Sequence, residues 1–457
     1  MENNTQQKRS SFTGKIGFVL AAAGSAVGLG NIWRFPYLAA KYGGGIFLLV
    51  YVLLAVTFGF VLMLAEIAIG RKTGKSAIGA FAALDKRFSF VGWLAAAVPI
   101  IILPYYSVIG GWVMKYVFGY ATGEGSEMAK DTYFTGYLGE VGEPLIWFGI
   151  FVLLTAVIVF FGVEKGIEKV SKVMMPVLII FMLFIIVYSL CTMDGIWEGV
   201  LYYITPDFSN FSIMTVVTAM GQLFYSMSLA MGIMITFGSY MKKDISIEKS
   251  IHQIEIFDSG VAFLSGLLIV PAVFATSGGS AEALGKGPSL MFVTLPKIFE
   301  TMPGGSIVGA IFFAMVFLAA ITSSISLMET IISIVMDKTK LSRRVSCLIV
   351  FGIILLFGIP SSLGFNVWSD VLFFGKLSFL DFFDFISNSI MMPIVAIITC
   401  IFVGFFIKPK AILDEAALKP KSFWGGMFDI VIRFVAPVFL VAILVTSVLE
   451  VFGVIVI

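Results

Sequence analysis

Long apolar stretches alternate with short polar segments along almost the whole chain. Eleven of these stretches approach or exceed the ~20 residues that a helix needs to cross a bilayer, so the pattern predicts an all-α polytopic membrane protein with eleven transmembrane helices. We expect these helices at about 16–39, 46–70, 90–119, 145–162, 173–191, 213–240, 256–277, 305–336, 345–364, 385–407 and 433–455.

The basic residues predict how these helices are oriented. With the N-terminus inside, 23 of the 30 Lys and Arg residues fall in segments on the cytoplasmic side, six fall on the other side, and Arg34 lies within the membrane. Positive charge favours the cytoplasmic side of membrane proteins. An odd number of helices then places the C-terminus on the extracellular side.

The first apolar stretch contains residues that an unbroken membrane helix avoids. The segment from Gly24 to Pro36 reads GSAVGLGNIWRFP and includes three glycines, Asn31 and Arg34. Lipid cannot hydrogen-bond free backbone groups, so a helix break at membrane depth is tolerated only where it lines a protein cavity. The free N–H groups and carbonyls of such a break suit an anionic group beside a small cation. Helix packing through Gly24 and Gly28 is the alternative interpretation.

The sixth stretch is interrupted in a similar way, since Gly221 to Ile233 mixes Gly, Gln and Ser with apolar residues. Interrupted helices at matching places in two halves indicate a transporter site between the halves. We therefore predict one transporter domain over 1–457. It contains two inverted five-helix repeats with broken helices 1 and 6, at 16–191 and 213–407, and an additional helix 11 at 433–455.

Composition excludes several other classes of protein. The chain is 59% hydrophobic and only 13% charged, and its net charge of +2 indicates no nucleic-acid partner. His252 is the only histidine, and the three cysteines lie far apart, so neither a His-based metal site nor a disulfide framework is expected. We predict that the protein is not an enzyme. The N-terminal residues lack the pattern of a cleaved signal peptide.

With these residues laid out, the chain resembles a bacterial member of the neurotransmitter:sodium symporter family along essentially its whole length. The resemblance implies an amino-acid symporter in the membrane of a bacterium, driven by sodium through alternating access. The motifs that carry it are Gly24 to Tyr37, Gly43 to Gly45, Tyr105 and Tyr106, Gly221 to Tyr225, and Ala319 to Ser324.

The resemblance implies a substrate site at the two breaks. The amides of Gly28 and Gly30 and the hydroxyl of Tyr106 suit a substrate carboxylate, and the flexible Met231 suggests room for a large hydrophobic or aromatic amino acid. The implied substrate-binding residues are Ser25, Ala26, Gly28, Gly30, Ile102, Tyr106, Tyr225, Ser226, Met231, Ser324 and Leu327.

It also implies two sodium sites. The first would use Ala26, Asn31, Ser226 and Asp258, and the second would use Gly24, Val27, Ala319, Thr322 and Ser323. The last three share one face of a helix. Hydroxyls that bond their own helix backbone are the alternative interpretation.

Asp258 stands where many animal members have Asn and bind chloride nearby, so a fixed carboxylate predicts that chloride is not required. This depends on the register of the seventh helix, because a slip of one residue would place Phe257 there. A solvated charge at the cytoplasmic end of the helix is the alternative interpretation.

The resemblance further implies two gates. Arg34 and Asp384 match the external pair, while Arg9 and Asp337 match the cytoplasmic pair, near Tyr240. Glu66 is predicted to be a buried acid that hydrogen-bonds a broken helix, because a lone carboxyl at membrane depth is costly. Glu329 raises the same question, and the sequence assigns it no role.

Two external segments, at about 120–144 and 278–304, are long enough to cover a vestibule, and the second is apolar enough for a lid. A transporter-like sensor and a proton-coupled transporter remain open as alternatives, while a channel or an intramembrane protease is disfavoured. The sequence identifies neither the amino acid, the ion stoichiometry nor the oligomeric state.

Overall fold

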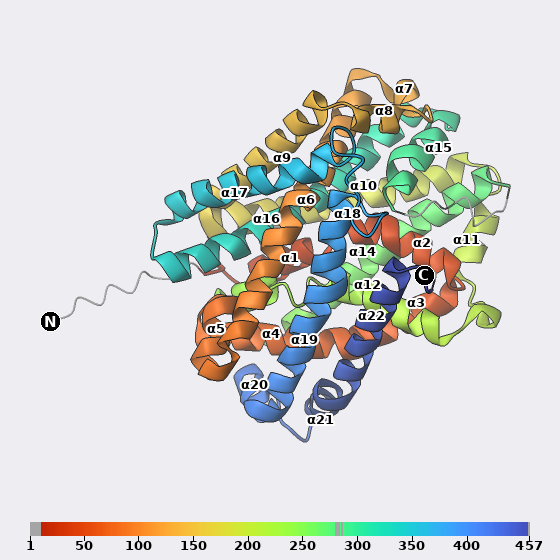
Figure 1. Cartoon of the computed structure of the whole chain (residues 1–457). Helices are drawn as coiled ribbons and strands as arrows, with labels where there is room; N and C mark the ends of the chain where they lie inside the picture. The colour runs from red at the N-terminus through yellow and green to blue at the C-terminus, as the bar shows by residue number, and fades with distance from the viewer. Residues whose placement is uncertain (1–10, 279–283, 285–286, 456–457) are drawn as a thin grey trace.

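The chain folds as a bundle of helices in the computed structural model, which describes residues 11–278, 284 and 287–455 (Figure 1). Within those ranges there is no strand, and two isolated backbone bridges are the only strand-like pairings. Nine helical runs there are long and apolar enough to cross a membrane, and a bent pair makes a tenth. The predicted all-α, multi-pass architecture is therefore confirmed.

Three of the nine long spans consist of two helices joined by a π-helical turn. The spans are α3 (Gly45–Leu54) with α4 (Phe60–Thr73), α6 (Ser89–Thr122), α9 (Gly142–Phe160), α10 (Lys169–Thr192), α14 (Ile247–Thr276), α16 (Gly305–Thr339), α17 (Arg343–Leu363), α18 (Phe379–Asp384) with α19 (Met392–Ile401), and α21 (Phe423–Ile430) with α22 (Ala436–Val451). The shorter helices between them are α5 (Ala77–Leu84), α7 (Gly125–Met128), α8 (Tyr133–Gly139), α11 (Ile196–Ile204), α15 (Leu295–Thr301) and α20 (Pro409–Ala416).

The first predicted helix is broken where its glycines lie. Helix α1 (Lys15–Ala26) ends at an extended residue, Val27, and the chain resumes as a π-helical turn, Gly30–Arg34, that leads into α2 (Phe35–Lys41). The two halves meet at 57°. The carbonyls that end α1 and the amides that begin the second half therefore lack regular helical partners.

The sixth predicted helix is also broken, into α12 (Ile213–Ser226) and α13 (Ile233–Ser239). A 14-residue helix is only ~21 Å long and cannot cross a ~30 Å hydrocarbon core alone, so α12 and α13 together make the eleventh span. Between them the backbone turns left-handed at Ser228 (φ 53°), Ala230 (φ 60°) and Gly232 (φ 72°).

Two helices that begin with a serine cap start about ten residues before their predicted positions. Helix α14 begins at Ile247 rather than near 256, and the last span begins at Phe423 rather than near 433. In each case a serine directly before the helix, Ser246 or Ser422, accepts a hydrogen bond from a backbone N–H of the first turn. Hydropathy locates the apolar part of a helix, whereas such N-caps fix where it begins.

The Gly43–Gly45 motif allows a close approach between chain segments. A β-carbon at Gly45 would lie 2.2 Å from the carbonyl oxygen of Ile204, and Gly43 has a φ of 90°. The amide of Gly45 donates to the carbonyl of Thr205. These glycines therefore let the turn between α2 and α3 pack directly against the end of α11.

The segments that connect the long helices lie on two opposite faces of the bundle, and polar contacts join them to one another on each face. We call the face with the Lys- and Arg-rich segments the basic face; there Ser76 contacts Asp337, and Arg71 contacts Glu415. On the opposite face α7 and α8 meet α15, where Ser126 donates to Glu300 and Lys297 pairs with Asp131. Figure 1 shows α7, α8 and α15 at one end of the molecule and α5, α20 and α21 at the other.

The two segments expected to cover a vestibule both lie on this opposite face. The first forms α7 and α8. The second contains a π-helical turn, Leu290–Thr294, and α15, while 279–283 and 285–286 of the predicted lid lie outside the described residues. Phe292 of this turn is fully buried and stacks on Phe134, with ring centroids 4.8 Å apart. The apolar character of the segment is thus explained by packing.

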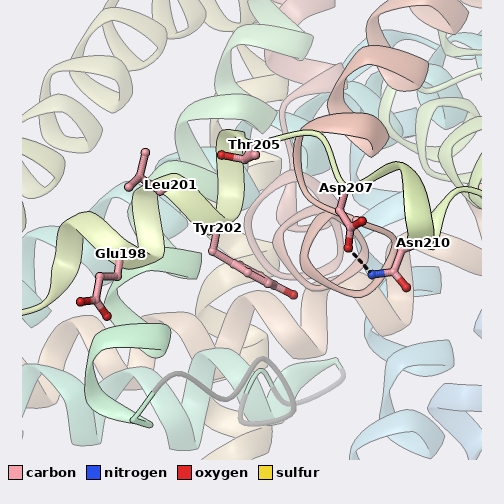
Figure 2. Close-up of a pocket in the computed structure, with 7 residues that line it drawn as sticks. Glu198, Leu201, Tyr202, Thr205, Asp207 and Asn210 are labelled. Atoms are coloured by element: carbon pink, nitrogen blue, oxygen red, sulfur yellow. Dashed lines mark hydrogen bonds between the residues drawn. The ribbon is translucent and has the colours of Figure 1, made fainter.

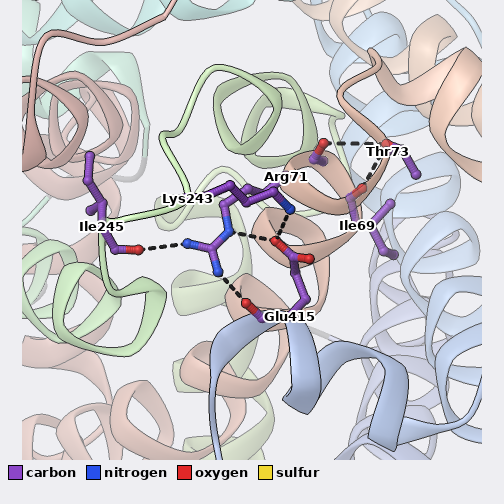
Figure 3. Close-up of polar contacts among 7 residues, drawn as sticks. Ile69, Arg71, Thr73, Lys243, Ile245 and Glu415 are labelled. Carbon is purple, nitrogen blue, oxygen red and sulfur yellow. Dashed lines mark hydrogen bonds and ion pairs between the residues drawn. The ribbon is translucent and has the colours of Figure 1, made fainter.

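An ion-pair cluster, in which Arg71 and Glu415 are nearly buried and Lys243 is exposed, joins three segments on the basic face (Figure 3). Arg71, at the end of α4, donates from Nε to Glu415 of α20 (2.8 Å) and from its guanidinium to the carbonyl of Ile245 (2.6 Å). Lys243 also donates to the Glu415 carboxylate (2.6 Å). Burial acts to raise the pKa of Glu415, but the hydrogen bonds from Lys243 and Arg71 outweigh it and lower the pKa below its ordinary value.

The variant Glu415→Gln should lower the apparent melting temperature at pH 7, because each charge-assisted hydrogen bond contributes about 1.5–3 kcal/mol. The folded pKa is depressed, so this stabilisation is present above the ordinary value of about 4.3 and is lost as pH falls through the folded pKa. The measurement is thermal unfolding of purified protein between pH 7 and pH 3. Asp414→Asn, an exposed neighbour, is the control; equal destabilisation by both variants would contradict the prediction.

Candidate functional site

The breaks of the two interrupted helices lie against each other in the core of the bundle. Ser228, in the second break, donates from Oγ to the backbone carbonyl of Ser25 at the end of α1 (2.9 Å). The hydroxyl of Ser25 donates to Ser228 Oγ (3.1 Å). The structure therefore brings together the two segments in which the sequence predicts the binding residues.

Helix α16 adds hydroxyls to the end of α1. Ser323 Oγ lies 3.4 Å from the carbonyl oxygen of Gly24, 3.2 Å from that of Ser25 and 3.2 Å from that of Val27. One hydroxyl proton can serve only one of these three acceptors. Thr322 Oγ1, one residue earlier, bonds its own helix at the carbonyls of Leu318 and Ala319. The local excess of oxygen acceptors is an arrangement that fits a small hard cation.

A second polar cluster joins α12 and α14 to the residue after the first break. Asn31 donates from Nδ2 to Ser226 Oγ (2.9 Å) and to Asp258 Oδ1 (2.9 Å). Ser226 donates to the same carboxylate oxygen (2.5 Å), and Tyr51 donates to the other one (3.1 Å). The structure thus places Asp258, and not Phe257, in this cluster, where it is fully buried. Tyr51 is not among the residues predicted from the sequence.

Gly28 lies at the centre of the first break. Its amide donates to Asn31 Oδ1 (3.1 Å), and a β-carbon there would come within 3.0 Å of Ser323 Oγ and 3.3 Å of the Tyr106 hydroxyl oxygen. Close by, Gln222 donates to the carbonyl of Gly30 (3.1 Å). A side chain at position 28 would therefore crowd the hydroxyls of Ser323 and Tyr106, which lie close to this glycine.

The remaining predicted pocket residues are buried around these breaks. Ile102, Met231 and Leu327 are each less than 10% exposed, and Ala26 lies in the same core. Ser324 is fully buried, and its Oγ has no hydrogen-bond partner in the described ranges. Because an orphaned hydroxyl is costly in a core, Ser324 is a candidate to contact a polar ligand.

Glu66 contacts the second broken helix, as its position in the sequence predicts. Its Oε1 accepts a hydrogen bond from the backbone amide of Ala230 (2.6 Å), and the side chain is buried. Ala230 is one of the left-handed residues of the break, so Glu66 satisfies an amide that the interrupted helix leaves exposed.

The predicted external ion pair between Arg34 and Asp384 is not formed as a direct contact. Arg34 instead lies over the ring of Tyr225, 4.6 Å from its centroid. Asp384 accepts hydrogen bonds from Tyr105 (3.1 Å) and Asn388 (2.6 Å). The Tyr225 hydroxyl donates to the carbonyl of Asn388 (3.2 Å). The Arg34 guanidinium therefore contacts the ring of Tyr225 and not the Asp384 carboxylate. Tyr225 connects the two charged residues indirectly, through Asn388.

The predicted inner pair is only partly described, because Arg9 lies outside the described residues. Asp337 accepts a hydrogen bond from the backbone amide of Ser76 (2.8 Å). Tyr240 donates its hydroxyl to Glu329 (2.8 Å), which also forms an ion pair with Arg343.

Arg343 gives Glu329 the partner that sequence analysis did not find. Arg343 also donates to the carbonyl of Val159 at the end of α9 (2.7 Å). Glu329 is fully buried, and a buried carboxylate needs a cation or a proton. This requirement could have indicated from the sequence that Glu329 has a basic partner. It could not have identified Arg343, which lies 14 residues away on the next helix.

A surface pocket on the opposite face does not involve any of these residues. It lies beside α11 and is lined by Gly43, Glu198, Leu201, Tyr202, Thr205, Asp207 and Asn210 (Figure 2). The Asp207 carboxylate already accepts hydrogen bonds from Ser209 and Asn210. In the described ranges no group of three or more His, Cys, Asp or Glu residues could hold a metal ion.

Comparison with known proteins agrees with this arrangement. The model of the sodium:neurotransmitter symporter family matches residues 9–126 and 128–454. Sodium-dependent transporters described as uncharacterized from Bacillus subtilis (YhdH) and Haemophilus influenzae are 35% and 32% identical to the chain. The alignments cover 95% and 98% of this chain, and 96% and 100% of the respective relatives.

Among solved structures, that of MhsT in complex with L-phenylalanine superimposes with a TM-score of 0.86 at 36% sequence identity. The match covers 96% of this chain and 100% of that one. Both the sequence and the fold thus match transporters, and not enzymes, over nearly the whole length. The chain belongs to the sodium:neurotransmitter symporter family.

Proposed function

We propose that the protein is a symporter that uses sodium to import an amino acid, a large hydrophobic or aromatic one, by alternating access. The observation that carries the proposal is the pairing of two helix breaks beside an excess of oxygen acceptors. The solved relative bound to L-phenylalanine supports the substrate class. The proposed architecture is two inverted halves, 16–191 and 213–407, with the additional helix at 433–455.

The substrate would bind across the breaks. The amides of Gly28 and Gly30, at a helix start, and the hydroxyl of Tyr106 would hold the carboxylate. Carbonyls freed by the breaks at Ala26 and Tyr225 would accept the ammonium. The side chain would extend toward Ile102, Met231, Ser324 and Leu327, where the flexible Met231 adapts to bulky shapes.

The second sodium ion would bind the end of α1 against α16. The carbonyls of Gly24 and Val27, the carbonyl of Ala319 and the hydroxyls of Thr322 and Ser323 are all neutral oxygens. Each would donate electron density without needing to lose a proton, so this site favours sodium over proton coupling.

Asn31 offers a way to couple the ion to the substrate. Its Nδ2 now faces Ser226 and Asp258, while its Oδ1 holds the amide of Gly28. A sodium ion beside Asp258 requires an oxygen there, which a half-turn of the amide group supplies. The same rotation removes the acceptor from the Gly28 amide and leaves it available to the substrate carboxylate. Sodium binding would thus prepare the carboxylate site.

Asp258 would replace the charge that chloride supplies in other members. Its carboxylate already satisfies the hydroxyls of Tyr51 and Ser226 and the amide of Asn31. A fixed negative charge in this position offsets the charge of the first sodium, so a diffusible anion is not needed.

Alternating access would use the contacts on the two faces as gates. On the opposite face, Arg34 and Tyr225 cover the site. On the basic face, Glu329, Arg343 and Tyr240 tie α16, α17 and α13 together, and the carbonyl of Tyr240 accepts the amide of Phe12 (3.2 Å). Breaking one set at a time would expose the breaks to one side.

Uptake of radiolabelled amino acids into proteoliposomes tests the function. An inward sodium gradient should drive uptake of at least one of Phe, Trp, Tyr, Leu and Met, and a potassium gradient should not. Sodium-independent uptake would indicate proton coupling, and binding without flux would indicate a sensor; either result would contradict the proposal.

Within this experiment, Ser323→Ala should raise the sodium concentration for half-maximal uptake at least about tenfold, as expected for losing a hydrogen-bonding ligand worth about 1.4 kcal/mol or more. The matched control is Ser326→Ala on the same helix, because the Ser326 hydroxyl bonds only its own helix at Thr322. Equal effects of the two variants would place the site elsewhere.

The variant Asp258→Asn should make uptake depend on chloride. Asparagine keeps the shape of the side chain but removes its negative charge. The Tyr51 and Ser226 hydroxyls then lose a charged hydrogen-bond acceptor, and the sodium ion loses its counter-charge. We expect little uptake in gluconate and partial recovery in chloride, whereas wild type should be equal in both. A variant equally active in both media would show that Asp258 does not replace chloride.

The variant Glu329→Gln should open the basic face more often, because Arg343 loses its ion pair. The backbone amides of residues 12–17 and 237–245 should exchange hydrogen for deuterium at least about fivefold faster. Fivefold is the lower end of the range that typical coupling free energies between two sites produce. Glu164→Gln, an exposed acid on the same face, serves as the control. Unchanged exchange in Glu329→Gln would remove this cluster from the gate.

A further inference from the structure

Two cation–π contacts join helix ends on either side of the connection between α16 and α17. Lys338, in the last turn of α16, contacts the N-terminal part of α6, and Arg344, at the start of α17, contacts the last residue of α9. Lys338 lies over the ring of Trp93 with its Nζ 4.6 Å from the centroid, and the Arg344 guanidinium lies 5.9 Å from the centroid of Phe160. Both cations therefore rest on aromatic rings near the ends of long apolar helices.

The rings that carry these cations face outward from the bundle. Trp93 is 54% exposed and Phe160 is 39% exposed. Just along α17, Val345 and Leu348 are also exposed, and nothing in the described chain covers them. Apolar side chains on the outer surface of a membrane helix face lipid, and Trp side chains are enriched at the depth of the headgroups. Trp93 would therefore place Lys338 near the level of the lipid phosphates.

Adjacent arginines at the start of α17 have different partners. Arg343 points inward, to Glu329 and the carbonyl of Val159, whereas Arg344 points outward, onto Phe160. Val159 and Phe160 are themselves consecutive, so the same two helix ends provide one inward and one outward contact. Arg344 has no acidic partner within ion-pair distance in the described ranges, which leaves its charge available.

The connection between α16 and α17 is held in shape by its own hydrogen bonds. Thr339 caps the end of α16 at the carbonyl of Val335 (2.7 Å) and accepts the amide of Leu341 (3.3 Å). Lys340 is left-handed (φ 58°) and exposed, and Ser342 accepts the amide of Val345 (3.5 Å). The nearby acid, Asp337, accepts the amide of Ser76. The cations are thus presented on an ordered turn.

We infer that this surface, formed by Trp93, Phe160, Lys338, Lys340 and Arg344, binds the headgroup of an anionic phospholipid. The phosphate would lie between the cations, while the acyl chains would follow the exposed apolar residues of α17. A soluble acidic partner would not account for rings and aliphatic side chains exposed at membrane depth. Arg87, which lies over Phe406, differs because Asp85 neutralises it (2.7 Å). This inference does not depend on the proposed substrate.

Native mass spectrometry of the purified protein, titrated with phosphatidylglycerol or phosphatidylcholine, tests the inference. Wild type should retain phosphatidylglycerol preferentially, and Lys338→Gln with Arg344→Gln should lower that preference by about fivefold for each cation removed, the effect expected for a basic residue near an anionic surface. The control is Lys410→Gln with Lys419→Gln, which removes the same charge from exposed sites near α20. Equal preference in all three proteins would overturn the inference, as would an equal loss in the control.

A melting experiment keeps the test decisive if the double variant folds poorly. Phosphatidylglycerol should raise the melting temperature of wild type more than that of the single variant Arg344→Gln, and inorganic phosphate at the same concentration should not raise it. An equal rise with inorganic phosphate would show an adventitious ion only and would reject the lipid assignment. An equal rise in wild type and Arg344→Gln would reject it as well.

Discussion

The backbone of a membrane protein must satisfy its own hydrogen bonds, and the centre of this protein is built around two places where helices do not. The breaks at Val27 and between Ser226 and Ile233 expose carbonyls and amides that no lipid can bind. They are tolerated because the two breaks lie against each other, the first also against α16 and the second also against Glu66. In the function that we propose, the same unpaired groups would be the ligands of the binding site, so stability and function would have one origin.

Much of the fold could be predicted from sequence because its signals are local. Glycines beside Asn31 and Arg34 in an apolar stretch locate the first break, and the register of α14 places Asp258 correctly in its cluster. Helix starts were less predictable, since Ser246 and Ser422 begin helices well before their apolar parts. Hydropathy reports burial in lipid, whereas these two helices extend beyond their apolar parts.

The contacts that sequence could not provide are those between distant segments. Glu329 needed a partner, but only the packing of α17 against α9 shows that it is Arg343. Arg34 and Asp384 were expected to pair, yet Tyr225 offers its ring to the arginine while Tyr105 and Asn388 occupy the acid. Which of several compatible partners a charged side chain takes depends on tertiary distances that spacing along a chain does not encode.

The left-handed conformation of Ser228 and Ala230 has a mechanical consequence. The left-handed conformation costs a residue with a β-carbon roughly 1–2 kcal/mol of conformational free energy. The break between α12 and α13 is therefore strained at Ser228 and Ala230, whereas two glycines would adopt the same conformation without this cost. The hydrogen bonds from Ala230 to Glu66 and from Ser228 to Ser25 hold it in place. If a movement that separates these partners also let Ser228 and Ala230 return to favoured dihedral angles, the free energy released would partly offset the loss of the two hydrogen bonds.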